Sequence, residues 1–221
     1  KYRFADPRAY IGIHRFYSHS AGPEDLALGQ AVSANITSYL VRMGVSPVLF
    51  ERMVNAGAGM QKLSIADAES LGLVNNGQLS PKWEIRGKDG QIYLYGMRES
   101  WMGTGEINVS CSINRPMTFT AFYGAEDNTK FISQTTRHTS VRLDGSFIGV
   151  TPSTGGNPSV INNALSTSFL LSKPLASQIS VSRSIGFAWH PSASDIFYGF
   201  DIPTSDQYEL VHAFFNHCIS L

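Results

Sequence analysis

The feature that most constrains the fold is a change in the spacing of apolar residues near Asn75. Before Asn75, apolar residues recur at three- and four-residue intervals, which is typical of amphipathic helices. Beyond Pro81, short runs of β-branched and aromatic residues alternate with turn residues, which is typical of antiparallel strands. The segment between them is polar and rich in turn formers. We therefore predict an α+β protein with two domains, residues 1–75 and residues 76–221.

The first domain is predicted to begin with a strand-like segment from Tyr2 to Phe4 and a turn at Asp6-Pro7. A second strand is expected from Ala9 to Phe16, in which only Gly12 disfavours a strand. Pro23 is well placed as the first residue of a long helix that Gly44 ends. The apolar residues of this helix lie at helical spacing and are Leu28, Val32, Ile36, Tyr39, Leu40 and Met43.

Two shorter helices are expected to follow the long one. Ser46-Pro47 reads as an N-cap followed by proline at the first helical position, with the helix running to about Val54. Leu63-Ser64 leads into the other, in which Ser64 and Asp67 are spaced like a capping box.

His14 is the first candidate for chemistry, because it closes the predicted strand Ala9–Phe16. A histidine at a strand end can serve as a general base. The alternative is a structural histidine that is hydrogen-bonded in the core or at the surface.

The order of these parts resembles the second half of the Clp-type serine protease and crotonase superfamily, in particular its periplasmic bacterial branch. The matching residues are Arg3-Phe4, Pro7, Ile13-His14, Leu63-Ser64-Ile65-Ala66-Asp67-Ala68-Glu69 and Leu71-Gly72-Leu73-Val74. The resemblance covers residues 1–75, and it implies that they form a partial crotonase-like α/β unit.

The resemblance also implies roles for individual residues. His14 would take the proton from a serine that attacks a carbonyl, and that serine is expected upstream of Lys1. We therefore expect the 221 residues by themselves to be inactive. The family's aspartate position holds Met60, which cannot orient an imidazole. Asn55 and Glu51 are the candidates for that role, but Glu51 also reads as a solvated helix residue and Asn55 as one that ends the helix. A triad, a serine–histidine dyad and no catalysis all stay open.

Two functions follow from the resemblance. The first is part of a periplasmic serine hydrolase that acts on peptides or other acyl compounds. The alternative is a catalytically inactive crotonase-like scaffold whose β-domain serves assembly or ligand binding. Half of a crotonase-type sheet leaves an open strand edge and bare helix faces, so we expect the missing half, the β-domain or another subunit to cover them. A homo-oligomer is the expected state.

The second domain is predicted to be an antiparallel β-sandwich or barrel closed by a C-terminal helix. Asp144-Gly145 is its clearest hairpin turn. Asp206 and Glu209 are spaced like a capping pair for the last helix, whose apolar face holds Phe214 and Cys218. The expected strands are 83–86, 91–97, 106–112, 117–123, 140–143, 147–150, 167–171, 178–185 and 196–200.

The two cysteines, Cys111 and Cys218, are predicted to point into one core. Alternation places Cys111 on the same strand face as Ile107, Val109 and Ile113, and this face should be buried. A disulfide and two buried thiols are both compatible with the pattern. In a periplasmic or secreted protein, as the resemblance suggests, the pair would be oxidised and would hold the terminal helix on the sheet.

Composition and motif spacing argue against several other functions. Lys+Arg and Asp+Glu are equal at 17 each, and no run of basic residues favours nucleic-acid binding. No apolar run reaches the length of a membrane span. The cysteines and the six histidines show no metal-binding spacing, so neither a metal nor another cofactor is expected. Trp189-His190-Pro191 is interpreted as an aromatic turn whose role is packing rather than recognition.

Overall fold

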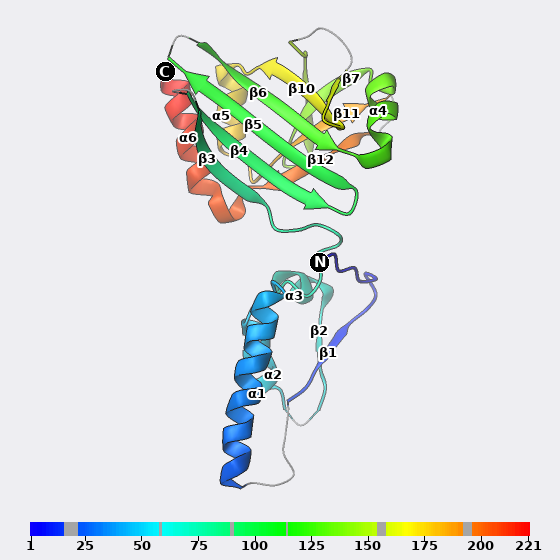
Figure 1. The fold of residues 1–221 in the computed structure, drawn as a ribbon, viewed down its shortest axis with the longest axis vertical. Coiled ribbons are helices and arrows are strands. Elements are labelled where there is room, and N and C mark those ends of the chain that lie inside the picture. Colours follow the sequence, from blue (N-terminus) through cyan, green and yellow to red (C-terminus); the bar gives the residue numbers. More distant parts are fainter. Residues whose placement is uncertain (16–21, 58, 89–90, 114, 154–157, 192–195) are drawn as a thin grey trace. The chain divides into compact units, whose positions relative to one another are not determined.

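A computed structural model of the chain describes all residues except 16–21, 58, 89–90, 114, 154–157 and 192–195. The chain divides into two compact units, unit 1 (Lys1–Gln78) and unit 2 (Leu79–Leu221) (Figure 1). The division lies close to Asn75, where the apolar spacing changes. Helices and antiparallel sheets are both present, so the α+β class is confirmed.

Unit 1 contains a small antiparallel sheet and three helices. The sheet consists of β1 (Ile11–Ile13) and β2 (Gln61–Leu63). The helices are α1 (Pro23–Arg42), α2 (Val48–Asn55) and α3 (Ile65–Ser70). Each of the three helices predicted before Asn75 is therefore present.

The strand predicted from Ala9 to Phe16 is much shorter in the structure, although Phe16 itself lies outside the described residues. The partner strand limits the length of β1. Strand β2 ends at Leu63 because Ser64 caps α3, where its hydroxyl oxygen accepts from the Asp67 amide at 3.1 Å. Only three residue pairs remain available to the ladder.

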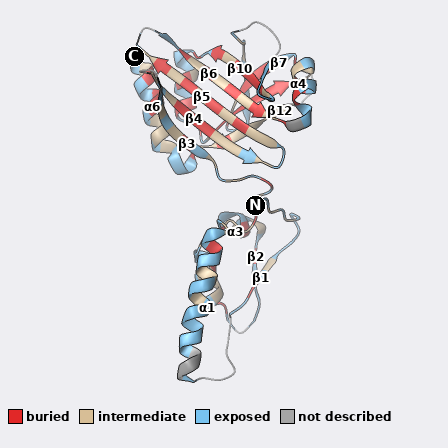
Figure 2. Ribbon diagram, viewed as in Figure 1, coloured by how far each residue is buried: buried red, intermediate tan, exposed pale blue. Residues whose placement is uncertain are grey.

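The core of unit 1 is small and involves only the C-terminal half of α1. Its buried residues are Ile13, Leu40, Val45, Leu49, Leu63 and Leu71. Three other residues of the predicted apolar stripe of α1, Leu28, Val32 and Tyr39, are 63 %, 41 % and 55 % exposed. Figure 2 shows this exposure along most of α1. Half of the apolar stripe predicted from the sequence therefore faces solvent in unit 1.

Unit 2 contains two antiparallel sheets. The six-stranded sheet has the order β3-β4-β5-β6-β10-β9, and the four-stranded sheet has the order β12-β11-β7-β8. The strands of the first are β3 (Lys82–Lys88), β4 (Gln91–Ser100), β5 (Gly103–Ser112), β6 (Arg115–Gly124), β10 (Ala164–Leu170) and β9 (Ser159–Ile161). Those of the second are β12 (Tyr198–Pro203), β11 (Ser184–His190), β7 (His138–Leu143) and β8 (Ser146–Val150).

Three helices flank these sheets (Figure 1). Helix α4 (Thr129–Thr135) lies beside β9 and β10, whereas α5 (Lys173–Ser180) packs against the C-terminal helix α6 (Tyr208–Ser220). Short 3-10 turns at Glu126–Asn128 and Ser205–Gln207 precede α4 and α6.

The two sheets share one core through their inner faces. The ring of Phe119 in β6 lies 6.2 Å from that of Phe187 in β11, and Tyr123 lies 5.9 Å from Trp189. Trp189 is fully buried, and its indole nitrogen donates to Thr167 Oγ1 at 2.9 Å. This face-to-face packing is that of a β-sandwich, and Trp189 has the packing role expected of it, within a strand rather than a turn.

Three local predictions for unit 2 are wrong. The strand predicted at 178–185 is wrong for all but its last two residues, because residues 178–180 belong to α5, which Ser172 caps, and β11 begins only at Ser184. The Asp206–Glu209 capping pair does not form, since a 3-10 turn precedes α6 and its N-cap residue makes no side-chain capping bond. Ile113 is 72 % exposed, because β5 ends before it at Ser112.

A disulfide joins Cys111 of β5 to Cys218 of α6. Both residues are buried in the shared core, together with Val211 and Phe214 on the same face of α6. The bond therefore attaches the last helix to the C-terminal end of β5 in the six-stranded sheet.

Candidate functional site

The register of β1 and β2 determines which residue faces His14. Ile11 pairs with Leu63 and Ile13 with Gln61, so the next pair along the same register is His14 and Met60. The Met60 side chain lies over Gly12, where a Cβ atom would collide with its thioether. The position that the resemblance assigns to the orienting aspartate is thus beside His14, but a thioether occupies it.

A main-chain oxygen contacts the His14 ring. Nδ1 of His14 lies 3.2 Å from the carbonyl oxygen of Arg15. A carbonyl oxygen only accepts hydrogen bonds, so this contact requires the proton on Nδ1. In the neutral ring, Nε2 then carries the lone pair, which is the arrangement that a carboxylate imposes on the histidine of a catalytic triad. His14 is exposed, so substrate-sized groups can reach it.

The two side chains suggested as alternative orienting groups are both on α2. Asn55 is the last residue of this helix and is exposed, and Glu51 is exposed in its first turn. Among the described residues, no hydrogen bond links either side chain to His14. The carbonyl of Arg15 could not be found from sequence patterns, because every residue carries one.

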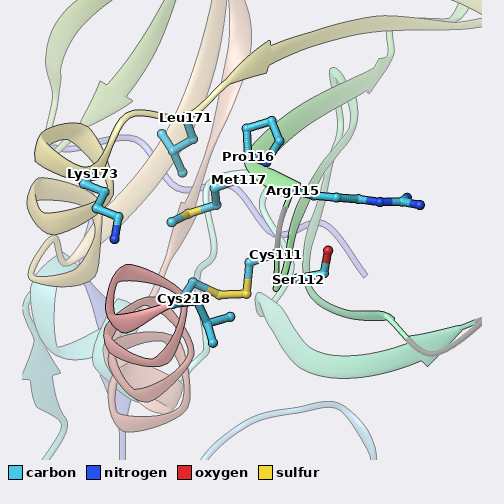
Figure 3. A pocket seen from close by; sticks show the side chains of 9 residues that line it. Cys111, Ser112, Arg115, Pro116, Met117, Leu171, Lys173 and Cys218 are labelled. Carbon is cyan, nitrogen blue, oxygen red and sulfur yellow. A yellow bond between two sulfur atoms is a disulfide. The ribbon is translucent and has the colours of Figure 1, made fainter.

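A groove of about 440 Å³ lies beside the disulfide of unit 2 (Figure 3). Its lining consists of Cys111, Ser112, Arg115, Pro116, Met117, Leu171, Lys173, Cys218 and Leu221. The charged side chains of this lining are both cations. Arg115 extends away from the disulfide, and Lys173 Nζ donates to the Ile219 carbonyl at 2.8 Å. A lining of mixed polar and apolar side chains with two cations suits a small ligand that has an anionic group.

A second group of polar side chains lies on the outer face of the four-stranded sheet. We call it the histidine–aromatic cluster, and its members are His138, Arg142, Phe147, His190, Phe197 and Asp201. The rings of His138 and His190 stack with centroids 4.3 Å apart and planes 8° from parallel. They occupy opposite positions in the β7–β11 ladder.

Two phenylalanines connect the histidine stack to an ion pair. The ring of Phe147 lies 5.1 Å from both the His190 ring and the Phe197 ring. The guanidinium of Arg142 lies over Phe147 and Phe197, at 5.6 and 5.2 Å from their centroids, and it forms an ion pair with Asp201. Cation–aromatic contacts of this kind are favourable when they are shielded from water.

Burial has electrostatic consequences in this cluster. His190 is only 6 % exposed, and its Nε2 has no hydrogen-bond partner among the described residues. Burial, assisted by the neighbouring His138, lowers the pKa of His190 below its ordinary value. Burial also raises the pKa of Asp201, although Arg142 and Arg98 act in the opposite direction. Alternation along β11 could have revealed the cluster, because it puts His190 and Trp189 on opposite faces.

Neither a metal site nor a membrane span is evident in the described parts of the chain. No group of three or more His, Cys, Asp or Glu side chains is arranged there to hold a metal ion. None of the described helices is both long and apolar enough to cross a membrane.

No protein-family model, curated protein or solved structure matches the chain. The geometry around His14 and the residues that carry the resemblance over positions 1–75 are therefore the grounds for a functional assignment.

Proposed function

We propose that this chain is part of a serine hydrolase of the Clp and crotonase type, in which His14 is the general base. The observation that carries the proposal is the contact between His14 Nδ1 and the Arg15 carbonyl, which leaves the lone pair on Nε2. That nitrogen would accept the proton of a serine hydroxyl as the hydroxyl attacks an acyl carbon. The serine would be supplied from outside the 221 residues.

A serine–histidine dyad is the mechanism that the residue at the family's aspartate position favours. Met60 comes directly before β2, next to the end of the β1–β2 ladder, and its thioether carries no charge that could stabilise an imidazolium. The Arg15 carbonyl holds the tautomer and supplies only a partial negative charge for the imidazolium that forms. We therefore expect a slower acyl transfer than an aspartate-assisted triad gives, with peptides or other acyl compounds as substrates and with no cofactor.

The exposed apolar residues of α1 support the idea that more protein packs on unit 1. Leu26, Leu28 and Val41 are each more than half exposed, and large apolar side chains at such density are uncommon on a free surface. The remaining half of a Clp-like domain, or another subunit, would bury them and bring the serine to His14. An oxidised Cys111–Cys218 pair is compatible with the periplasmic or secreted location that the resemblance suggests.

This proposal is tested by assaying hydrolysis with a longer protein that includes residues upstream of Lys1, which we call the parent protein. A chain that extends these residues upstream should cleave fluorogenic peptides or esters, and His14→Gln should lower kcat by about 10²–10⁴-fold, the usual contribution of a general base. Asn55→Ala is the matched control, because it removes an exposed polar side chain with no hydrogen bond to His14 among the described residues, and it should leave kcat unchanged. Equal turnover by the parent protein and His14→Gln would refute the role of His14.

The second candidate is a scaffold without turnover, and Met60 is the observation that favours it. A position beside the histidine that holds a thioether instead of a carboxylate is expected where catalysis is no longer required. In that case the groove beside the disulfide would provide ligand binding in unit 2. Absence of any hydrolysis by the extended chain, together with saturable binding of a small carboxylate such as decanoate that Arg115→Ala weakens, would favour the scaffold.

A further inference from the structure

The outer face of the four-stranded sheet carries an arrangement that is independent of His14. Its central element is a pair of imidazole rings stacked face to face, one exposed (His138) and one nearly fully buried (His190). Stacking at 4.3 Å is favourable for neutral rings, whereas two imidazolium rings in the same position repel each other. The packing of the pair therefore depends on its charge.

The surrounding charges cannot compensate for protonation of both rings. Arg142, which lies over Phe147 and Phe197, is a cation, and so is Arg137, which stands next to His138 and whose amide donates to the His190 carbonyl at 2.8 Å. Among the described residues of the cluster, the negative charge that could offset an imidazolium is the carboxylate of Asp201, and this carboxylate already pairs with Arg142. A proton on His190 would also bring a charge to a site where Nε2 has no hydrogen-bond partner.

We propose that the His138–His190 stack is an acid-sensitive latch, which keeps the histidine–aromatic cluster closed near neutral pH and releases it when the rings are protonated. On release, the charged His190 moves toward water, and Phe147 and Phe197 lose the ring that packs against both of them. The consequence is greater exposure of Phe197, which is half-buried in the closed state, and of Phe147, which is already 46 % exposed, without loss of the sandwich core.

The direction of the pH response follows from the burial of His190. Its pKa is lowered in the folded state, so between the ordinary value of about 6.5 and the lowered value the unfolded or opened chain binds a proton that the closed state does not. Stability of the closed state therefore falls as pH decreases through this window. Above this pH window, His190 is neutral in both the closed and the opened state, and the stack contributes its full stabilisation to the closed state.

Nuclear magnetic resonance of the 221-residue chain between pH 8 and pH 4.5 tests the latch. We expect the His190 ring protons and the cross-peaks between Phe147 and Phe197 to change together, with a midpoint below about 6.5. In His190→Phe, which keeps an aromatic ring without the titrating group, the cross-peaks should persist throughout. His217→Gln, on the exposed face of α6, is the matched control and should behave like the parent chain.

Two outcomes would overturn the proposal. One is loss of the Phe147–Phe197 cross-peaks at the same pH in His190→Phe, which would assign the response to Asp201. The other is a parent chain whose cross-peaks persist after both rings have become protonated. Should His190→Phe not fold, His138→Phe decides the question. In His138→Phe the stack holds one imidazole that can carry a charge instead of two, so the Phe147–Phe197 cross-peaks should weaken less at pH 5 than in the parent chain. Equal weakening in the two proteins would refute the latch.

Discussion

At the scale of single residues, two buried aromatic nitrogens show how position determines the effect of a polar group. The indole nitrogen of Trp189 is satisfied by Thr167, whereas Nε2 of His190 on the opposite face has no partner among the described residues. The first bond contributes to the stability of the core. At His190, protonation of Nε2 would place a charge where no described hydrogen-bond partner stabilises it. The stability of the fold at this position therefore depends on pH.

Replacement of Thr167 by valine should destabilise unit 2 by about 1–3 kcal/mol, because it leaves the buried indole N–H without an acceptor. Urea unfolding followed by tryptophan fluorescence measures the effect. Thr120→Val is the matched control. Its hydroxyl bonds to Ser168 Oγ at a half-buried position that water can reach, so the loss should stay below about 1 kcal/mol. Equal losses of unfolding free energy in Thr167→Val and Thr120→Val would show that the hydrogen bond to the Trp189 indole contributes no more than a half-buried one.

At the scale of elements, the β7–β8 hairpin shows a turn that its residue types alone determine. Asp144 and Gly145 have φ values of 50° and 86°, the left-handed region that a two-residue turn of type I′ requires. Asp144 Oδ1 also accepts from the amides of Arg183 and Ser184, each at 2.9 Å. The turn therefore joins β7 to β8 and also fixes the start of β11.

Gly145→Ala should cost about 1–2 kcal/mol of unfolding free energy, because a Cβ atom disfavours the left-handed conformation. A Cβ at Gly145 meets no atom within 4 Å, and the same is true of Gly149 in β8, whose φ is not positive. Gly149→Ala is therefore a control that adds the same methyl group without backbone strain, and it should cost less. Comparable losses measured by thermal unfolding would contradict the backbone explanation.

The elements also show which predictions a sequence supports. Helices α1 to α3 and the Asp144-Gly145 hairpin follow local rules of capping and turn chemistry, so they were predictable. The segment 178–185 was not, because its apolar residues suit either a strand or the end of a helix, and the cap at Ser172 decides between them. His14 stays a prediction from its place at a strand end, and its contact with the Arg15 carbonyl is one that no residue pattern reveals.

At the scale of the whole molecule, the units differ in how their cores are completed. Unit 2 buries the inner faces of two sheets and closes them with α6, which the Cys111–Cys218 bond attaches to β5. Unit 1 buries few residues and leaves half of the α1 stripe exposed. The sequence predicted this stripe, but the extent of its burial depends on what packs against it.

Removal of the disulfide by Cys111→Ala with Cys218→Ala should destabilise unit 2 by about 2–5 kcal/mol, because the bond closes a long loop in the unfolded chain. All three tryptophans, Trp83, Trp101 and Trp189, lie in unit 2, so their fluorescence reports on this unit alone. The unmodified chain with its disulfide chemically reduced should show the same decrease in the urea midpoint of unfolding as the double variant. An unchanged midpoint in the double variant would mean that the bond contributes nothing to folding.

Charged residues on α1 should reduce self-association of the 221-residue chain. Leu28→Lys with Val32→Lys places charge on side chains that are 63 % and 41 % exposed, so the helix itself should be retained. Sedimentation velocity at micromolar concentration should show assemblies of the parent chain and monomers of the variant. Gln30→Lys with Ala34→Lys is a control that adds the same charge at the same spacing, at exposed positions outside the apolar stripe of α1. A monomeric parent chain would contradict this expectation.

The proposed general-base role of His14 is tested most directly by the rate at which a fluorophosphonate phosphonylates a serine of the upstream-extended protein with loss of fluoride, since this needs no knowledge of the substrate. We predict labelling of one serine, slowed about 10²–10⁴-fold by His14→Gln and unchanged by Asn55→Ala. Labelling that proceeds equally fast in His14→Gln, or that does not occur in the parent protein at all, would contradict the account.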